Sequence, residues 1–342
     1  MKDELDRRKF LKTVTRVAAT GAVPVGVVSA GSQKKRIDVD VAIPIRTLGR
    51  TGVKLPILGY GGAALPKAWG NPLSTEDRIK LVRYAYDRGV RYYDTAGNYM
   101  DSQYILGEAL KDIRDKVFLT SKVEVMRAGM TRQAFKKVLD ELKTNYLDAI
   151  LIHGTPGLEQ MTVKEAMKVH GELAKLREEG TVRFIGFSAH SYFDKALALI
   201  ESDGFDLCML SYGYIPRGYD QIWSARMTEL RNACIAKAYE RGMGIVAMKV
   251  IGAGILGAWS EYIVPEFDKK LLRQLPAAAI HHVLDDERVD LLVIGMRLKD
   301  EIDANVKIFT GDTSYTSDNR SLLTDFCSKA YDSDAIKKMK ID

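Results

Sequence analysis

The feature that most constrains the fold is a regular alternation of short apolar runs with longer stretches of helical periodicity, starting near Pro56. This alternation is typical of repeated βα units around a parallel sheet. The runs predicted as strands are 56–60, 90–94, 117–122, 149–153, 182–188, 207–211, 245–249 and 291–295. The predicted helices are 75–88, 103–111, 132–144, 164–179, 193–201, 225–241, 269–284 and 300–309.

Eight strands, each followed by a helix, predict an α/β fold of one kind: a closed (β/α)8 TIM barrel. An open doubly wound sheet usually has fewer strands and a topological switch point. No GxGxxG follows an early strand, so the open dinucleotide-binding fold has no support in this chain. Residues 45–54 resemble a hairpin with a turn containing Gly49 and Gly52, which we expect to cap the bottom of the barrel.

Composition narrows the class of protein. The chain is 46% hydrophobic and 28% charged, which is usual for a soluble globular protein. Half of its net charge of +6 lies in residues 1–30, so the remainder has no basic footprint for nucleic acid. Cys208, Cys234 and Cys327 are far apart and form no CxxC, which predicts neither a disulfide framework nor a metal site.

The first 30 residues have the parts of an export signal. Asp6 to Lys12 (DRRKFLK) precedes a weakly apolar run over 14–28, and the run ends in Val28-Ser29-Ala30. The segment resembles a twin-arginine signal, which implies the twin-arginine export machinery as a partner and a periplasmic destination. The run is shorter than the roughly 20 apolar residues of a membrane span, so no permanent anchor is expected.

These features divide the chain into residues 1–30 as signal, 31–45 as polar linker and 46–342 as barrel with a polar C-terminal tail. The alternative for the first segment is a basic N-terminus on a cytoplasmic protein.

Ionisable side chains end three successive predicted strands. Asp94, Lys122 and His153 occupy these positions, and Tyr99 lies in the loop that follows Asp94. In a barrel, the carboxyl ends of neighbouring strands meet at the face that carries the active site. Singly these residues read as a cap, a solvated strand end, a core histidine and a loop aromatic, but their order predicts one cluster at the mouth.

The motifs around this cluster occur in a characteristic order. They are Asp94-Thr95-Ala96 with Tyr99, Thr120-Ser121-Lys122, Ile152-His153-Gly154, Gly186-Phe187-Ser188, Ala247-Met248-Lys249-Val250 and the segment from Ile294-Gly295 to Asn305. Through them the chain resembles the aldo-keto reductase superfamily over about residues 45–310. The resemblance implies a catalytic tetrad of Asp94, Tyr99, Lys122 and His153.

The chemistry follows from these side chains. Carbonyl reduction needs a hydride, which no side chain stores, so a nicotinamide cofactor is implied. Tyr99 is expected to act as general acid, its pKa of about 10 drawn downward by the Lys122 ammonium. Asp94 holds Lys122, while His153 is expected to orient the carbonyl as a hydrogen-bond donor.

By the same resemblance, the cofactor crosses the barrel mouth. The implied cofactor contacts are Gly61, Gly62, Ala63, Ser188, His190, Met209, Met248, Lys249, Gly252, Gly254, Gly295, Arg297, Glu301 and Asn305. Three of the neighbouring positions depart from the family pattern: Ala189 replaces a usual Asn, Met209 a frequent Gln and Met248 a frequent aromatic. His190, which follows Ala189, either replaces the Asn contact or starts the next helix.

Cofactor preference depends on the last of these segments. Gly295 and Glu301 stand where NADP-dependent members typically have Lys and Arg, while Arg297 is placed to reach a 2′-phosphate. Gly295 and Glu301 thus weaken the case for NADP(H), but the resemblance implies NADP(H) as the usual cofactor, so it is expected slightly ahead of NAD(H).

The substrate is expected to be a small-molecule carbonyl compound or sugar, bound by aromatic loops. The candidate contacts are Trp69, Met126, Tyr212, Tyr214 and Arg217. Two further functions stay open: a nicotinamide-binding sensor or auxiliary subunit, and a redox-neutral sugar-modifying enzyme that retains its cofactor.

Overall fold

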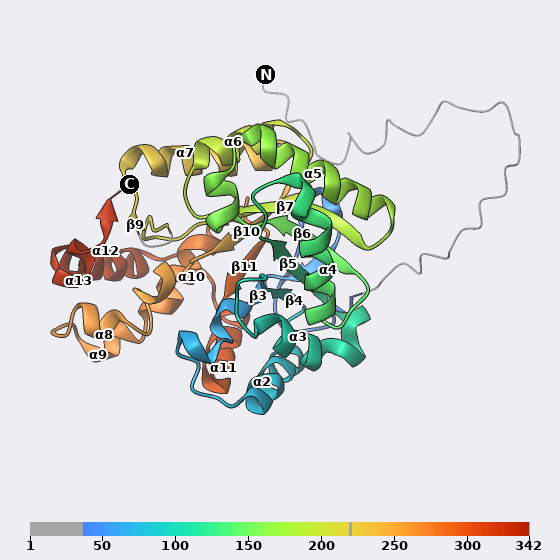
Figure 1. Cartoon of the computed structure of the whole chain (residues 1–342). Coiled ribbons are helices and arrows are strands. Elements are labelled where there is room, and N and C mark those ends of the chain that lie inside the picture. Colours follow the sequence, from blue (N-terminus) through green and yellow to red (C-terminus); the bar gives the residue numbers. More distant parts are fainter. Residues whose placement is uncertain (1–36, 219–220, 342) are drawn as a thin grey trace, which may run out of the picture. The chain divides into compact units, whose positions relative to one another are not determined.

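A computed structural model describes residues 37–218 and 221–341 (Figure 1). The predicted twin-arginine segment and the start of the predicted linker lie outside these residues. No helix in the described part of the chain is long and apolar enough to cross a membrane.

Eight parallel strands close into a barrel in the order β10-β11-β3-β4-β5-β6-β7-β8, which confirms the predicted (β/α)8 architecture. Their bounds are β3 Leu58–Gly61, β4 Tyr92–Asp94, β5 Phe118–Val123, β6 Leu147–Ile152, β7 Val182–Ala189, β8 Leu207–Ser211, β10 Gly244–Met248 and β11 Leu291–Ile294. Each lies within two residues of a predicted strand at both ends.

Helices surround the barrel (Figure 1). They are α2 Thr75–Asp87, α3 Ser102–Leu110, α4 Thr131–Glu141, α5 Val163–Glu178, α6 Phe193–Glu201, α7 Ala225–Glu240, α8 Ser260–Ile263, α9 Lys269–Leu272, α10 Leu275–Leu284, α11 Lys299–Thr310, α12 Ser317–Asp332 and α13 Asp334–Lys337. The prediction of one helix over 269–284 was wrong, because α9 ends at Leu272 and α10 starts at Leu275. Pro276 has no backbone N–H and its ring clashes with the carbonyl four residues earlier, so a helix cannot continue through it unbroken.

The hairpin closes the bottom of the barrel, as predicted. Strands β1 (Ile45–Thr47) and β2 (Lys54–Pro56) pair antiparallel, and the turn returns through Gly52 at φ 69°. The Gly49 N–H donates to the Asp290 carboxylate, and the Arg50 N–H donates to the Gly242 carbonyl, both just ahead of strands β11 and β10.

The predicted linker over 31–45 is partly structural. Ile37 and Ile43 are buried, Ile37 among the side chains inside the barrel and Ile43 in the layer between barrel and helices. The Arg91 guanidinium also donates to the Asp38 carbonyl oxygen. Residues from Ile37 onward therefore pack against the barrel rather than forming a tether.

Side chains alternate between the two faces of each strand. Tyr92, Phe118 and Leu151 belong to the cluster inside the barrel, whereas Tyr93 and Leu119 pack in the layer that includes the helices. The same alternation directs Asp94, Lys122 and His153 inward at the carboxyl ends of β4, β5 and β6, where the mouth lies.

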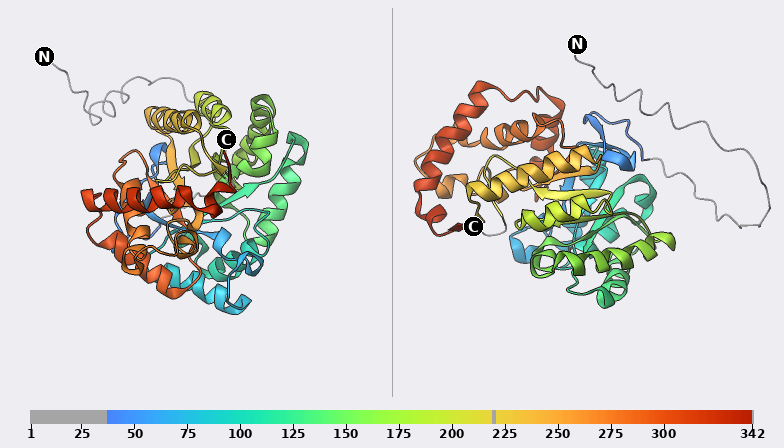
Figure 2. Two further views of the ribbon diagram at one scale, coloured as in Figure 1. Left: turned by 90° about the vertical axis from the view of Figure 1, so that its left-hand side faces the viewer. Right: turned by 90° about the horizontal axis from the view of Figure 1, so that it is seen from above.

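The C-terminal tail, predicted only to be polar, folds into a layer of its own. Helix α12 buries Leu323, Phe326 and Cys327 against α10, α13 contacts α8, and β12 (Lys340–Ile341) pairs parallel with β9 (Gln221–Ile222) in the loop after β8. Figures 1 and 2 show α12 and α13, in red, on the side of the barrel where α8 and α9 lie.

Candidate active site

The Lys122 ammonium is the centre of the mouth cluster. It lies 2.6 and 2.8 Å from the two carboxylate oxygens of Asp94 and donates to the Thr95 carbonyl oxygen at 2.8 Å. The Lys122 side chain is 1% exposed. Three acceptors around one buried ammonium fix its position, because a buried charge is tolerated only when paired and hydrogen-bonded.

Tyr99 joins the cluster from the loop after β4. Its ring centroid is 4.9 Å from Lys122 Nζ and 5.8 Å from the His153 ring. Trp69 packs edge-on against the Tyr99 ring at 5.5 Å. The structure therefore brings together all four residues of the predicted tetrad, with Trp69 beside them.

The pKa values of Tyr99 and Lys122 are both raised, but for different reasons. Burial raises the pKa of Tyr99 more than the Lys122 charge lowers it, so its pKa lies above its ordinary value. Burial is the largest single influence on Lys122 and opposes its charge, but Asp94 and Tyr99 together outweigh it, so the pKa of that ammonium is raised. The net pKa shift of Tyr99 is thus opposite to the one expected from Lys122 alone, and the neutral phenol is the dominant form.

Sequence reasoning missed Glu124, which follows β5. Its carboxylate oxygen Oε1 lies 3.0 Å from Nδ1 of His153 and accepts the Asn98 N–H at 2.9 Å. Glu124 therefore links the histidine after β6 to the loop that carries Tyr99. The signal in the sequence was weak, since a glutamate two residues beyond a lysine is ordinary on an exposed strand end.

Arg78 of α2 is a second residue that the sequence did not reveal. Its guanidinium donates to the Leu65 carbonyl oxygen at 2.9 Å and pairs with Asp101 at 2.8 Å. Arg78 is buried, and it ties the loop after β3 to the loop after β4, so it holds Trp69 and Tyr99 on adjoining segments.

Four of the predicted cofactor residues, Gly61, Gly62, Ala63 and Gly295, lie where β3 meets β11. A Cβ on Gly62 would come within 2.4 Å of the Asp94 carbonyl oxygen, and one on Gly61 within 3.1 Å of the Gly295 backbone nitrogen. Glycine is required at Gly62 because the protein's own backbone fills the space a side chain would take. Ala63 and Gly295 are exposed at the mouth.

The predicted contacts on β7, β8 and β10 are buried. The Ser188 hydroxyl oxygen accepts the Gly154 N–H at 2.9 Å, and the His190 ring lies 6.5 Å from the His153 ring. Burial lowers the pKa of His190 well below its ordinary value, so this ring is neutral. Met209 and Met248 are in the interior cluster, where they form the upper apolar layer of the barrel.

The loop after β10 has a run of left-handed backbone. Lys249 (φ 59°), Gly252 (60°), Ala253 (51°) and Gly254 (98°) all have positive φ. This backbone turns sharply directly above the barrel mouth, which is the geometry that lets backbone N–H groups approach an anion. The Gly252 and Gly254 N–H groups donate within the loop, to the Lys249 and Ile251 carbonyl oxygens, and the pyrophosphate role of the loop stays a prediction.

The α11 segment places Arg297 and Glu301 together. The Glu301 carboxylate accepts the Arg297 backbone N–H at 2.5 Å, and the Arg297 guanidinium donates to the Trp69 carbonyl oxygen at 3.2 Å. The Asn305 amide donates to the Glu301 carbonyl oxygen at 2.8 Å. The Glu301 carboxylate thus accepts a backbone hydrogen bond just before α11, and the Arg297 side chain connects this segment to the loop after β3.

Three of the five predicted substrate contacts are directed elsewhere. The Tyr212 hydroxyl donates to Asp286 at 2.6 Å, the Tyr214 hydroxyl bonds Thr324 of α12, and the buried Arg217 guanidinium donates to the Gly252 carbonyl oxygen. Tyr214 thus joins its loop to α12, Tyr212 bonds a residue just after α10, and Arg217 joins its loop to the loop after β10. Met126 is exposed beyond β5, and Trp69 alone of the five contacts the tetrad.

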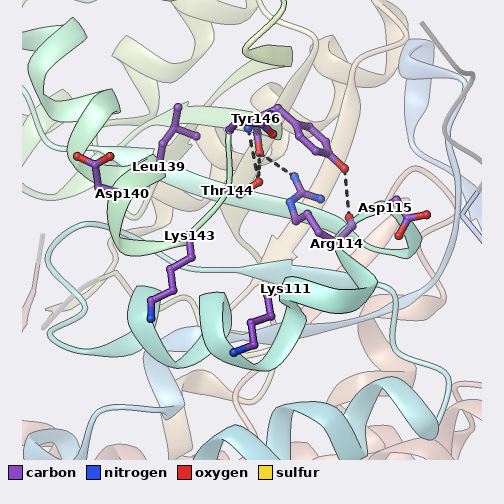
Figure 3. A pocket seen from close by; sticks show the side chains of 9 residues that line it. Lys111, Arg114, Asp115, Leu139, Asp140, Lys143, Thr144 and Tyr146 are labelled. Carbon is purple, nitrogen blue, oxygen red and sulfur yellow. Dashed lines mark hydrogen bonds between the residues drawn. The ribbon is translucent and has the colours of Figure 1, made fainter.

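A shallow pocket lies at the opposite end of the barrel, before β5 and β6 (Figure 3). Its basic residues have partners: Lys111 and Lys143 pair with Glu108, and Arg114 pairs with Asp148. In the described residues, no group of three His, Cys, Asp or Glu side chains is arranged to hold a metal ion.

Comparison with known proteins agrees with this geometry. A family model described as the Aldo/keto reductase family matches residues 57–320. The chain is 27% identical over 225 residues to an aldo-keto reductase from Glycine max, which is 61% of this chain and 60% of that protein. It is 23% identical to L-galactose dehydrogenase from Arabidopsis thaliana over 315 residues, covering 87% of this chain and 93% of the relative.

Solved structures give the same fold. The holo form of an aldo-keto reductase from Bacillus halodurans superposes with a TM-score of 0.64 at 18% identity, over 83% of this chain and 96% of that one.

Proposed function

The chain belongs to the Aldo/keto reductase family, and from this premise we propose that it is an oxidoreductase for aldehydes or ketones, with a nicotinamide cofactor and Tyr99 as general acid. Hydride comes from the bound nicotinamide, since no side chain stores one. The observation that carries the proposal is the buried Lys122–Asp94 pair beside the Tyr99 ring.

Each of these tetrad residues has a separate role in the proposed reaction. The neutral Tyr99 phenol donates its proton to the substrate oxygen as hydride reaches the carbon. The Lys122 ammonium, 4.9 Å from the ring, stabilises the phenolate that this transfer leaves behind. Asp94 neutralises Lys122 and keeps it in place when the mouth is occupied. Efficient proton transfer requires groups that are held in place. The hydrogen bonds between Lys122, Asp94 and the Thr95 carbonyl oxygen provide this.

The residues around the mouth suit a nicotinamide dinucleotide. The glycines of the left-handed loop from Lys249 to Gly254 let a pyrophosphate approach the backbone closely, and Lys249 carries a positive charge there. Ser188 supplies a hydroxyl from inside the barrel, and Gly295 leaves the rim beside β3 open. These residues would hold the cofactor with its ring near Tyr99.

Preference for NADP(H) over NAD(H) is the finer part of the proposal. The Glu301 carboxylate is engaged by the Arg297 backbone N–H, which offsets its repulsion of a 2′-phosphate. The Arg297 guanidinium sits at the start of α11, where the helix dipole also favours an anion.

Titration of the purified protein with NADPH and NADH tests this proposal, with nicotinamide fluorescence as the signal and a panel of aldehydes for turnover. We expect binding of both and tighter binding of NADPH. Arg297→Ala weakens NADPH about tenfold through loss of charged hydrogen bonds and leaves NADH nearly unchanged. Arg273→Ala, on exposed surface, is the control. Absence of binding by either cofactor contradicts the proposed function.

We also propose that the protein is exported. The support is the order of basic, apolar and small residues in the first 30 positions. Because the twin-arginine route carries folded proteins, the cofactor would be bound before export.

A further inference from the structure

Arg231 is a buried cation outside the active site. It lies on α7, the helix that follows β8, and is 7% exposed. Its Nε donates to the Asn232 side chain at 2.8 Å, whereas Nη1 is buried and has no hydrogen-bond partner among residues 37–218 and 221–341. A buried guanidinium is normally paired with an acceptor, because a charge removed from water without one is costly.

Asp286, the carboxylate that acts on Arg231, is already paired with other groups. Its Oδ2 accepts the Tyr212 hydroxyl at 2.6 Å and Arg288 Nη2 at 2.8 Å, and its Oδ1 accepts Arg288 Nε at 2.8 Å. Burial has the largest effect on the pKa of Arg231 and lowers it, while the Asp286 charge raises this pKa and the Arg288 charge lowers it. Two arginines therefore share one carboxylate, which leaves an excess positive charge in this part of the described chain.

Two aromatic rings flank the guanidinium, and one of them carries a second buried donor. Arg231 Cζ lies 4.3 Å from the Tyr212 ring centroid and 5.8 Å from the Trp223 ring centroid. Trp223 is 5% exposed, and its Nε1 has no hydrogen-bond partner in the described residues. An aromatic face attracts a cation but does not replace an acceptor for its N–H groups. Two neighbouring side chains thus each bury an N–H donor that no described acceptor meets.

We propose that Arg231, with the Trp223 indole N–H beside it, binds a small inorganic anion of single charge, such as a halide. Two donors and a positive charge suit an anion better than water, which also needs acceptors for its own protons. Burial of both side chains limits the ligand to a small ion, and one guanidinium balances one negative charge. The inference goes beyond the proposed function, since neither residue belongs to the tetrad or to the predicted cofactor contacts.

The site lies at the base of the loop after β8. Tyr212 directly follows β8 and Trp223 lies two residues before α7, so the rings that flank Arg231 come from the two ends of this loop. The loop includes Arg217, whose guanidinium donates to the Gly252 carbonyl oxygen in the loop after β10. An anion at Arg231 compensates the buried charge where both ends of the loop meet α7, so its binding stabilises the folded protein.

Thermal unfolding in different salts tests the site in solution. The natural protein is heated in sodium chloride, sodium bromide and sodium methanesulfonate at equal ionic strength. The halides should raise Tm by about 2–4 °C over methanesulfonate, whose anion is too large for an enclosed site. Equal Tm values in the three salts overturn the proposal. The measurement needs no turnover, so its result does not depend on the proposed function.

Arg231→Met removes the charge and keeps a long side chain beside Tyr212. Its Tm should be the same in all three salts. In methanesulfonate it should be at least as stable as the natural protein, because an apolar side chain replaces a buried charge that lacks a partner. Arg226→Met is the matched control: Arg226 lies on the same helix but is exposed, so this variant should keep the full halide response. A halide response that persists in Arg231→Met contradicts the proposal.

Two further measurements do not depend on the folding of Arg231→Met. Trp223→Phe keeps an aromatic ring and removes the indole N–H, so the halide concentration that gives half of the Tm rise should increase roughly tenfold; an unchanged concentration contradicts the site as proposed. Crystals grown in bromide locate the ion by anomalous scattering, with a peak expected beside Arg231 Nη1. The absence of that peak overturns the proposal. A peak there without a thermal response marks an adventitious ion only and also contradicts it.

Discussion

The two ends of the barrel each bury a carboxylate with a cation, and the pairs are built differently. At the bottom, the fully buried Asp148 accepts from Arg114 at 2.8 Å, Arg183 at 2.6 Å and the Leu119 N–H at 3.0 Å. At the mouth, both oxygens of Asp94 face Lys122. One carboxylate joins three separate segments, and the other holds a single ammonium.

This difference shows how to tell a structural ion pair from a functional one. Burial alone does not distinguish them, since both carboxylates are buried. What differs is the neighbour: the bottom pair is enclosed by backbone and arginines, whereas the ammonium at the mouth lies beside a phenol and an imidazole. The ion pair that stabilises the fold therefore lies at one end of the strands, and the ion pair placed for chemistry lies at the other end.

The strongest test of the comparison is Tyr99→Phe. Removing the hydroxyl takes away the acid but leaves the ring that packs on Trp69, so turnover should fall by roughly 10³-fold while NADPH affinity and thermal stability are kept. Steady-state kinetics and cofactor titration measure both. Retention of near-natural rates would remove Tyr99 from the acid role.

Asp148→Asn should have the opposite profile. It leaves Arg114 and Arg183 without a buried counter-charge, so the free energy of unfolding should fall by about 3 kcal/mol, with kcat unchanged below the unfolding transition. Denaturant titration followed by assays on the folded protein checks this. A loss of activity without a loss of stability would show that the bottom pair is not purely structural.

A smaller effect on activity should follow from Lys122→Met. Alcohol oxidation uses the deprotonated Tyr99, so its rate rises with pH; the Lys122 charge lowers the pKa of Tyr99 and burial raises it. Without that charge the pKa rises further, the oxidation profile moves to higher pH, and the rate at neutral pH falls about tenfold. Rate profiles over pH measure the shift; movement to lower pH would contradict the assigned influence of Lys122.

The barrel was predictable because its strands are short continuous apolar runs, buried on both faces. The error over 269–284 had a visible cause in Pro276, whose effect on a helix is local. The C-terminal layer was missed because apolar residues such as Leu323 and Phe326 are spaced along a mostly polar helix, and its partner, α10, lies far earlier in the sequence.

At the mouth, the residues at strand ends were predictable, as was Tyr99 in the short loop after β4, whereas residues in the long loop after β8 were not. Alternation along a strand sets the direction of Asp94 and Lys122, but no such rule directs Tyr212 or Tyr214, which turn to the outer helices. Glu124 was missed because its importance lies in a contact with His153 on the neighbouring strand end.

The pairing of strand β12 affects the order in which parts of the fold can form during synthesis. It is formed by residues 340–341 and pairs with β9, in the loop between β8 and α7. Since a chain leaves the ribosome from its N-terminus, β9 is made before β12 and cannot pair with it until residues 340–341 have emerged. The loop between β8 and α7 therefore reaches its final pairing only after more than a hundred further residues have been made.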